Sequence, residues 1–198
     1  EDWGNKCEPK IIDSGSRAKG TAISIASDVD YLVSLGNETN GSLKDIYESF
    51  HTCLSSYYST TRKQNVSIKI NINGLEVDIT PARRQEGHTN YHSIYNSKLD
   101  TWTQTNIQQH IVDVSQSDRT KEIKLLKIWR ELNKLDLPSI YLEYLTINYL
   151  LYGKRVGDLA NNFYHCLSEL ATSDNNSLFS KIVDPANSNN ELSSFNNR

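Results

Sequence analysis

The chain of 198 residues has no methionine, few cysteines and no long hydrophobic run. Its cysteines, Cys7, Cys53 and Cys166, form no Cys-x-x-Cys pair and no zinc-binding spacing, which excludes the common zinc modules and a disulfide-rich scaffold. An odd number of scattered cysteines is typical of thiols that stay reduced, so we expect a cytoplasmic protein. No segment approaches the ~20 apolar residues of a membrane span, so we expect no membrane partner.

Charge of one sign is also scarce, because the net charge is −3. Strong nucleic-acid binders usually carry a basic patch or a high isoelectric point, and here only short basic pairs occur, at Arg62-Lys63 and Arg83-Arg84. The polar start, Glu1-Asp2-Trp3, does not have the pattern of a signal peptide. Because the initiator methionine is missing, we expect the sequence to be trimmed or part of a longer protein.

Two carboxylates, Asp28 and Asp30, follow a glycine-serine turn at Gly15-Ser16. The segment 28–35 has the pattern of a strand, and side chains two residues apart on a strand point to the same face. Two hard oxygen ligands beside a glycine-rich turn can hold Mg²⁺ next to a phosphate chain. The pattern therefore predicts a phosphate-binding metal site near the start of this strand.

A third carboxylate, Asp78, lies in a segment that alternates apolar and polar residues from Leu75 to Thr80. The preceding segment, 66–72, alternates as well, and Asn73-Gly74 between them is typical of a two-residue hairpin turn. If this strand lies beside the strand with Asp28 and Asp30, the three carboxylates can bind two divalent ions about 4 Å apart. We expect Pro81 to end the strand.

The remaining pattern predicts strands early in the chain and helices late. Ser42 is a plausible N-cap for a helix that runs to about Tyr57, and 10–13 and 91–95 have the pattern of short strands. Residues from 101 onward are expected to be helical, with Asp118 as a cap, Pro138 in a first turn and Gly153 as a stop; the expected helices cover about 118–135, 138–152, 156–170 and 178–182. This order predicts an α+β fold.

Together these motifs resemble the DNA polymerase β-like nucleotidyltransferase superfamily, in residues Gly15-Ser16, Gly20-Thr21, Asp28-Val29-Asp30 and Val77-Asp78-Ile79. Two branches are the most similar: the cGAS/DncV-like and oligoadenylate-synthase-like enzymes, and the archaeal-type CCA-adding enzymes. The resemblance implies a polymerase-β-like palm with a mixed sheet and flanking helices over residues 1–100. It implies a helical domain over 101–198 that closes the nucleotide site.

By this resemblance Asp28, Asp30 and Asp78 are catalytic and bind two Mg²⁺ ions, for which Mn²⁺ could substitute. The alternative without a catalytic role is that these are three ordinary polar positions on an exposed sheet face. Gly15 and Ser16 are expected to hold the β- and γ-phosphates of the nucleotide.

Three residues of the later half complete the nucleotide site that the resemblance implies. Lys127, in the segment Glu122–Trp129, would reach the triphosphate, although Lys124 competes for this role and either lysine could simply lie at a solvated helix edge. His110 and Ser139 are weaker candidates, since a lone histidine is more often structural.

The activity implied is Mg²⁺-dependent transfer of a nucleoside monophosphate from an NTP such as ATP to a hydroxyl, with release of pyrophosphate. The leading acceptor is another nucleotide, as in the cGAS/DncV-like synthases of cyclic or linear oligonucleotides, which also implies a part in antiviral defence. The alternatives are an RNA or tRNA 3′-end transferase of the CCA-adding type and a catalytically inactive nucleotide- or RNA-binding module. The sequence does not decide the oligomeric state.

Overall fold

The computed structural model describes residues 9–26, 28–88, 90–172 and 182–193. The chain forms two compact units, and each is described separately. The first unit comprises residues 1–17 and 28–108, and the second comprises 18–27 and 109–198. The sequence suggested one division at residue 100, whereas the structure places 18–27 with the later half and 101–108 with the earlier one.

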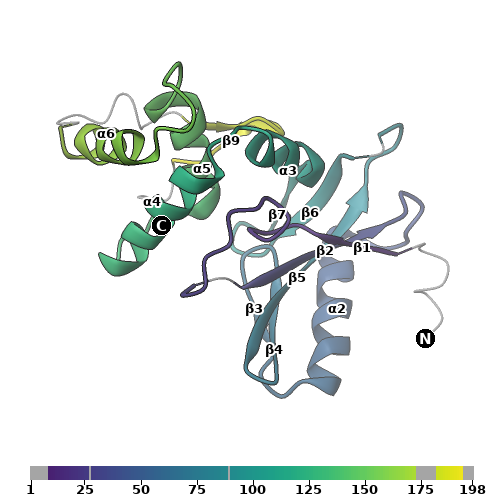
Figure 1. The fold of residues 1–198 in the computed structure, drawn as a ribbon. Helices are drawn as coiled ribbons and strands as arrows, with labels where there is room; N and C mark the ends of the chain where they lie inside the picture. Colours follow the sequence, from purple (N-terminus) through teal and green to yellow (C-terminus); the bar gives the residue numbers. More distant parts are fainter. Residues whose placement is uncertain (1–8, 27, 89, 173–181, 194–198) are drawn as a thin grey trace. The chain divides into compact units, whose positions relative to one another are not determined.

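The first unit is built on a mixed sheet (Figure 1). In its described residues the strand order is β1-β2-β5-β4-β3, with β6 beside β5 and β7 beside β6. β2 and β5 are parallel, and the other pairs are antiparallel. The strands are β1 (Lys10–Asp13), β2 (Val29–Leu35), β3 (Arg62–Lys63), β4 (Ile68–Ile72), β5 (Leu75–Arg84), β6 (His92–Asn96) and β7 (Thr101–Thr105). The α+β class that the sequence predicted is confirmed.

The β4–β5 hairpin has the turn that its sequence predicted. Asn73 and Gly74 have φ values of 52° and 87°, the left-handed conformation required at both central positions of a type I′ turn. Asn71 stabilises the turn, because its side-chain oxygen accepts a hydrogen bond from the Gly74 backbone N–H at 2.8 Å. This turn fixes the register of the hairpin and therefore the face on which Asp78 lies.

The expectation that Pro81 ends its strand is wrong, because β5 continues to Arg84. The register of β5 with β4 ends at Ile79, and its register with β6 begins at Ala82. Pro81 lies where β5 exchanges one antiparallel neighbour for the other, so its missing N–H costs no ladder hydrogen bond on that side.

The expectation of helix from residue 101 onward is also wrong for its first segment. Residues Thr101–Thr105 form β7, which pairs with β6 along its whole length. The short turn between them includes Asp100 at a φ of 48°. A strand of alternating threonines suits a pleated, half-exposed sheet better than a helix.

Helix α2 (Leu43–Tyr57) covers one face of this sheet (Figure 1). It begins after Ser42, as predicted, with a capping box: the Asp45 backbone N–H donates to Ser42 Oγ at 3.1 Å, and the Ser42 N–H donates to Asp45 Oδ2 at 2.9 Å. Tyr47 of α2 is buried against Ile68 and Tyr95 of the sheet. The opposite face of the sheet carries Asp30 of β2 and Asp78 of β5, and beyond them an apolar cluster that includes Leu32 and Ala82.

Replacing Ser42 with Ala is expected to lower the free energy of unfolding by about 1 kcal/mol, because the orphan N–H of Asp45 loses its acceptor. Chemical denaturation followed by far-UV circular dichroism would measure this. Ser55→Ala is the matched control, since Ser55 is exposed in the same helix, where alanine is a better helix former. Equal losses in both variants would contradict a capping role.

The second unit is mainly helical in its described residues. It contains α3 (Ile107–Ser115, whose first two residues belong to the first unit), α4 (Thr120–Leu132), α5 (Ser139–Leu145), a π-helical segment η1 (Thr146–Leu150), α6 (Leu159–Thr172) and the hairpin β8 (Val183–Asp184) and β9 (Asn187–Glu191). Its core is an apolar cluster that includes Leu126, Leu142, Leu145, Leu151 and Cys166. The helices expected near 138–152 and 156–170 are therefore present, with shifted ends.

One helix cap was predicted wrongly. The residue that precedes α4 is Arg119, which makes no side-chain capping bond, while Asp118 has a φ of 56° one position earlier. A left-handed residue cannot serve as the N-cap, which normally has an extended backbone. The helix expected at 178–182 falls almost entirely outside the described residues.

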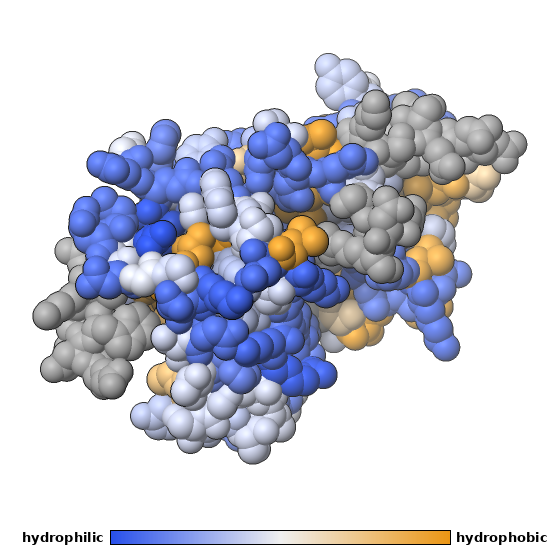
Figure 2. All heavy atoms as spheres, turned by 180° about the vertical axis from the view of Figure 1, so that it is seen from behind, coloured by the Kyte–Doolittle hydropathy of each residue, from blue (hydrophilic) through white to orange (hydrophobic). Residues whose placement is uncertain are grey.

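In the described ranges no helix is both long and apolar enough to cross a membrane. On the face shown in Figure 2, hydrophobic side chains form small, separate patches among hydrophilic ones.

Candidate active site

The parallel pairing of β2 and β5 brings two of the predicted carboxylates together. Asp30 lies directly opposite Asp78 in the strand register. The neighbouring residues Val29 and Val77 pack with Ile70 on the face covered by α2, so the two aspartates occupy the other face. Adjacent strands are about 4.8 Å apart, which places the two carboxylates side by side.

A lysine that the sequence interpretation missed lies among these carboxylates. Lys69 of β4 is opposite Asp78 in register, and its side chain is only 12% exposed. Its Nζ is 2.6 Å from Asp28 Oδ2, 2.8 Å from Glu76 Oε2 and 3.8 Å from Asp78 Oδ2. One ammonium group therefore links three acidic side chains; we call Asp28, Asp30, Glu76, Asp78 and Lys69 the carboxylate cluster.

Burial, together with the excess of negative charge in this cluster, shifts the pKa of Asp78. Burial raises the pKa of the Asp78 carboxyl; the Lys69 charge opposes this, the charges of Asp30, Asp28 and Glu76 add to it, and the result is about 6. Gln64 Nε2 donates to Asp78 Oδ1 at 3.1 Å. Burial lowers the pKa of Lys69, but its hydrogen bonds to Asp28 and Glu76 outweigh burial and raise it. The cluster therefore favours an additional positive charge.

The chemistry of these residues fits a divalent metal ion. Carboxylate oxygens are the hard ligands that Mg²⁺ prefers, and the Lys69 ammonium shows that a cation is stabilised among them. As the side chains lie, no group of three or more His, Cys, Asp or Glu residues in the described part of the chain could hold a metal ion. With Lys69 in contact, the arrangement is an ion-paired cluster.

The glycine-serine turn lies directly on Asp30. The Ser14 backbone N–H donates to the Asp30 carbonyl oxygen at 2.9 Å. A Cβ atom added to Gly15 would lie 1.9 Å from Asp30 Oδ2 and 2.6 Å from its Cγ, so no side chain fits here. Gly15 is thus packed against Asp30, and the next residue, Ser16, is half-buried; the role of this turn toward a phosphate stays a prediction.

Gly15→Ala is expected to lower the free energy of unfolding by about 1–3 kcal/mol and to impair catalysis, because the methyl group displaces the Asp30 carboxylate. Thermal unfolding and nucleotide turnover would measure the two effects. Asp30→Ala removes the two nearest clashing atoms, so Gly15→Ala should cost less stability in that background. Additive losses in the double variant would contradict the clash.

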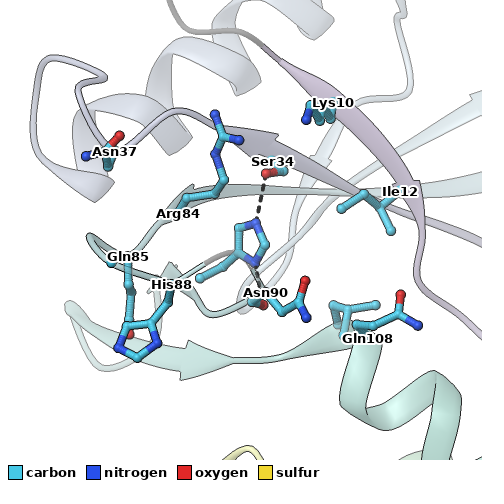
Figure 3. A pocket seen from close by; sticks show the side chains of 12 residues that line it. Lys10, Ile12, Ser34, Asn37, Arg84, Gln85, His88, Asn90 and Gln108 are labelled. Carbon is cyan, nitrogen blue, oxygen red and sulfur yellow. Dashed lines mark hydrogen bonds between the residues drawn. The ribbon is translucent and has the colours of Figure 1, made fainter.

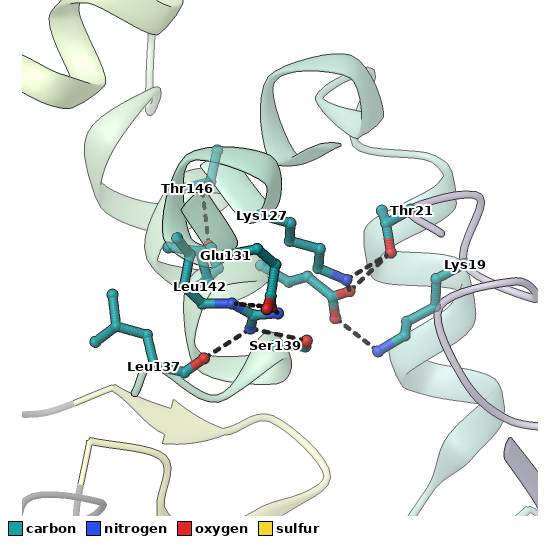
Figure 4. A network of polar contacts seen from close by, with 10 residues as sticks. Lys19, Thr21, Lys127, Glu131, Leu137, Ser139, Leu142 and Thr146 are labelled. Carbon is teal, nitrogen blue, oxygen red and sulfur yellow. Dashed lines mark hydrogen bonds and ion pairs between the residues drawn. The ribbon is translucent and has the colours of Figure 1, made fainter. Parts of the chain in front are cut away.

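The second unit holds Lys127, which is 2% exposed in α4 (Figure 4). Its Nζ donates to Glu143 Oε1 at 2.6 Å and to Thr21 Oγ1 at 3.0 Å. Lys19 donates to Glu143 Oε2 at 2.6 Å, and Thr21 donates to Glu143 Oε1 at 2.8 Å. We call these four residues the Glu143 cluster. It ties the segment 18–27, which follows the glycine-serine turn, to α4 and α5.

Burial and charge pairing compete in setting the pKa values of the Glu143 cluster. It lowers the pKa of Lys127, more than the Glu143 charge raises it. Burial raises the pKa of Glu143, but the charges of Lys19 and Lys127 outweigh it, and the net shift is downward. Glu143 is therefore ionised and bound by two lysines.

His110 and Ser139 also have partners within the second unit. His110 Nε2 is 2.7 Å from Asp184 Oδ1, and both side chains are buried. Burial raises the pKa of Asp184, but the hydrogen bond and charge of His110 outweigh burial, and the net shift is downward. Ser139 Oγ accepts from Arg130 Nη1 at 3.1 Å. Lys127, His110 and Ser139 thus lie in separate contacts, and their roles toward a nucleotide stay predictions.

The fold and the carboxylate cluster define a class of protein. A mixed sheet whose central parallel strands carry paired aspartates beside a glycine-serine turn, with a helical half after it, is a polymerase-β-like nucleotidyltransferase. Residues 4–118, more than half of the chain, match the family described as the Second Messenger Oligonucleotide or Dinucleotide Synthetase (SMODS) domain. The chain belongs to this family of nucleotidyltransferase enzymes.

Solved structures share the fold at low sequence identity. The E. coli MS115-1 CdnC in complex with HORMA-deltaN is 20% identical, with a TM-score of 0.75 over 98% of this chain and 71% of that one. The Rhodothermus marinus CdnE c-UMP-AMP synthase is 18% identical, with a TM-score of 0.63 over 85% and 72%. The Vibrio cholerae DncV cyclic AMP-GMP synthase is 13% identical, with a TM-score of 0.64 over 87% and 53%. No curated protein sequence is significantly similar to this chain.

These comparisons confirm the superfamily and its cGAS/DncV-like branch as the sequence motifs predicted them. The fold itself is shared with the CdnC, CdnE and DncV structures named above.

Proposed function

We propose that this chain transfers a nucleoside monophosphate from an NTP to the hydroxyl of a second nucleotide and so makes a cyclic or linear oligonucleotide. The observation that carries this proposal is the pairing of Asp30 with Asp78 across β2 and β5, with Asp28 nearby and Gly15 packed on Asp30. Membership of the SMODS family supports it.

Asp28, Asp30 and Asp78 would hold Mg²⁺, with Mn²⁺ as a substitute; when bound, the ions neutralise the triphosphate and lower the pKa of the attacking hydroxyl. Asp78, with a pKa of about 6, is mostly ionised at neutral pH and can accept a proton from that hydroxyl. Lys69 holds Asp28, Glu76 and Asp78 close together before an ion binds.

Gly15 and Ser16 would bind the phosphates of the NTP. Gly15 has no side chain, so its backbone can come close to a phosphate, and Ser16 adds a hydroxyl donor to the backbone N–H groups of the turn. Lys19 and Thr21, three and five residues after Ser16, are fixed by Glu143, which limits the motion of the chain that leaves the turn.

The relatives favour a nucleotide acceptor, because two of them are named as synthases of c-UMP-AMP and cyclic AMP-GMP. The net charge of −3 agrees with this choice, since a tRNA-binding enzyme is expected to carry a basic surface.

Incubation of the protein with labelled NTPs and Mg²⁺ or Mn²⁺, with and without tRNA, tests the proposal. Phosphatase-resistant oligonucleotides formed without tRNA, and absent with Asp30→Asn, are the expected result. Label that appears only on tRNA would replace the nucleotide acceptor with an RNA end. No product under any of these conditions, from protein that binds NTPs, would favour an inactive binding module.

A further inference from the structure

The first unit contains a second polar site on the same face of its sheet as the carboxylate cluster. A cavity of about 620 Å³ opens at the far ends of β2 and β5 (Figure 3). Its walls come from β1, β2, β5 and β6, from the loop after β5 and from the start of α3, and they include Lys10, Ser34, Arg84, His92, Asn90 and Gln108. We call it the distal cavity.

The strand register shows that the distal cavity is separate from the carboxylate cluster. Ser34 lies four residues after Asp30 on β2, and Arg84 lies six after Asp78 on β5, so both share the face of the aspartates. At about 3.3 Å per residue the two sites are roughly 13–20 Å apart. The buried side chains of Leu32, Ala82 and Ile94 form an apolar band between them.

A buried, hydrogen-bonded histidine forms the floor of the distal cavity. His92 is 3% exposed, and its two ring nitrogens lie 2.8 Å from Ser34 Oγ and 3.0 Å from the Asn90 carbonyl oxygen (Figure 3). Burial lowers the pKa of His92, and the nearby Arg84 charge lowers it further. The ring is therefore neutral at physiological pH and holds the loop residue Asn90 against β2.

The charge around this floor has one sign. Lys10 and Arg84 contribute cations, and none of the described residues that line the cavity is an aspartate or a glutamate. The amide side chains of the lining, from Asn37, Gln85, Asn90 and Gln108, offer both donors and acceptors. Lysine and arginine side chains bind phosphate, and amides match the hydrogen-bonding edge of a heterocycle.

We propose that the distal cavity binds a phosphate-bearing small molecule of nucleotide size, at a site distinct from the carboxylate cluster. Its volume falls within the ~300–1,000 Å³ of typical small-molecule sites. Arg84 and Lys10 contact the phosphate, and the amides orient the remainder of the ligand. The binding is independent of a metal ion and of the proposed nucleotide transfer.

Titration calorimetry with ATP in excess EDTA tests this proposal. The double variant Asp30→Asn/Asp78→Asn serves as the background in which the carboxylate site is weakened. We expect ATP to bind the wild-type protein and this double variant with the same affinity. Lys10→Gln/Arg84→Gln should weaken binding at least tenfold. The matched control Lys44→Gln/Lys98→Gln removes two exposed lysines elsewhere in the first unit and should change affinity less than twofold.

Melting temperatures of all variants separate loss of the cavity from loss of the fold. If the double variant Lys10→Gln/Arg84→Gln is unfolded, Lys10→Gln alone serves, because Lys10 is exposed, and it should still weaken binding several-fold. The proposal is overturned by absence of binding at millimolar ATP, by equal losses in the cavity and control variants, or by binding that disappears with Asp30→Asn/Asp78→Asn.

Discussion

Asp78→Asn is expected to reduce nucleotide transfer by about 10²–10³-fold, since one lost charge-stabilising group in a catalytic site typically costs that much. The same substitution is expected to stabilise the metal-free protein near neutral pH. Asp78 is paired in register with Asp30, and its carboxylate is largely buried near other negative charges. Asparagine keeps the oxygen that accepts from Gln64 but removes the charge.

The sign of the stability effect follows from the pKa of Asp78. Its folded value of about 6 is above the ordinary 3.8, so between these values the folded protein holds a proton that the unfolded chain has released. The free energy of unfolding therefore falls as the pH rises through this window, by up to about 3 kcal/mol for two pKa units. Asp78→Asn removes this loss, so its stabilising effect should be present above about pH 6 and absent below about pH 4.

Thermal unfolding in EDTA at several pH values, together with product formation in Mg²⁺, would measure both effects. Glu76→Gln is the matched control, because Glu76 contacts the same lysine but is 43% exposed. It should alter activity less than tenfold and leave the melting temperature almost unchanged. An Asp78→Asn protein that is less stable than wild type in EDTA at about pH 8 would show that favourable contacts of the Asp78 carboxylate outweigh its burial and the repulsion from its acidic neighbours.

The carboxylate cluster could be predicted from the sequence as far as local periodicity reaches. Alternation and the Asn73-Gly74 turn placed Asp78 on the returning strand of a hairpin, and the spacing of Asp28 and Asp30 placed them on one face. The same turn also implies the register in which Lys69 is opposite Asp78, so the sequence contains the signal that places this lysine. The pairing of β2 with β5 is non-local, and only the family resemblance suggested it.

Other features depend on contacts that local patterns do not encode. Thr101–Thr105 becomes a strand because β6 offers an open edge, and β5 passes through Pro81 because its neighbour changes there. Glu143 receives Lys19 from 124 residues away, so spacing could not reveal the pair. A single glutamate inside the apolar run Ile140–Leu145 was the available hint, since a buried acid requires a partner.

Glu143→Gln is expected to lower the free energy of unfolding by about 3–5 kcal/mol, because it leaves two buried lysines without their counter-ion. Glu143 is 0% exposed, and its two carboxylate oxygens accept from Lys19, Thr21 and Lys127. The glutamine amide cannot accept all three bonds, and its NH₂ group would face a lysine ammonium. For a chain of this size the melting temperature should fall by roughly 10 °C or more.

Differential scanning calorimetry or fluorimetry would measure this loss, with Glu131→Gln as the matched control. Glu131 also pairs with a cation, Arg130, but is 35% exposed, so its replacement should cost less than about 1 kcal/mol.

Lys127→Met should recover part of the stability of Glu143→Gln, because it removes one of the buried charges left unpaired. Since the pKa of Glu143 is lowered below its ordinary 4.5, its contribution is present above that value and is lost as the pH falls further. A Glu143→Gln protein as stable as Glu131→Gln would mean that the lysines find other partners or water, and that the segment 18–27 is not held by this carboxylate.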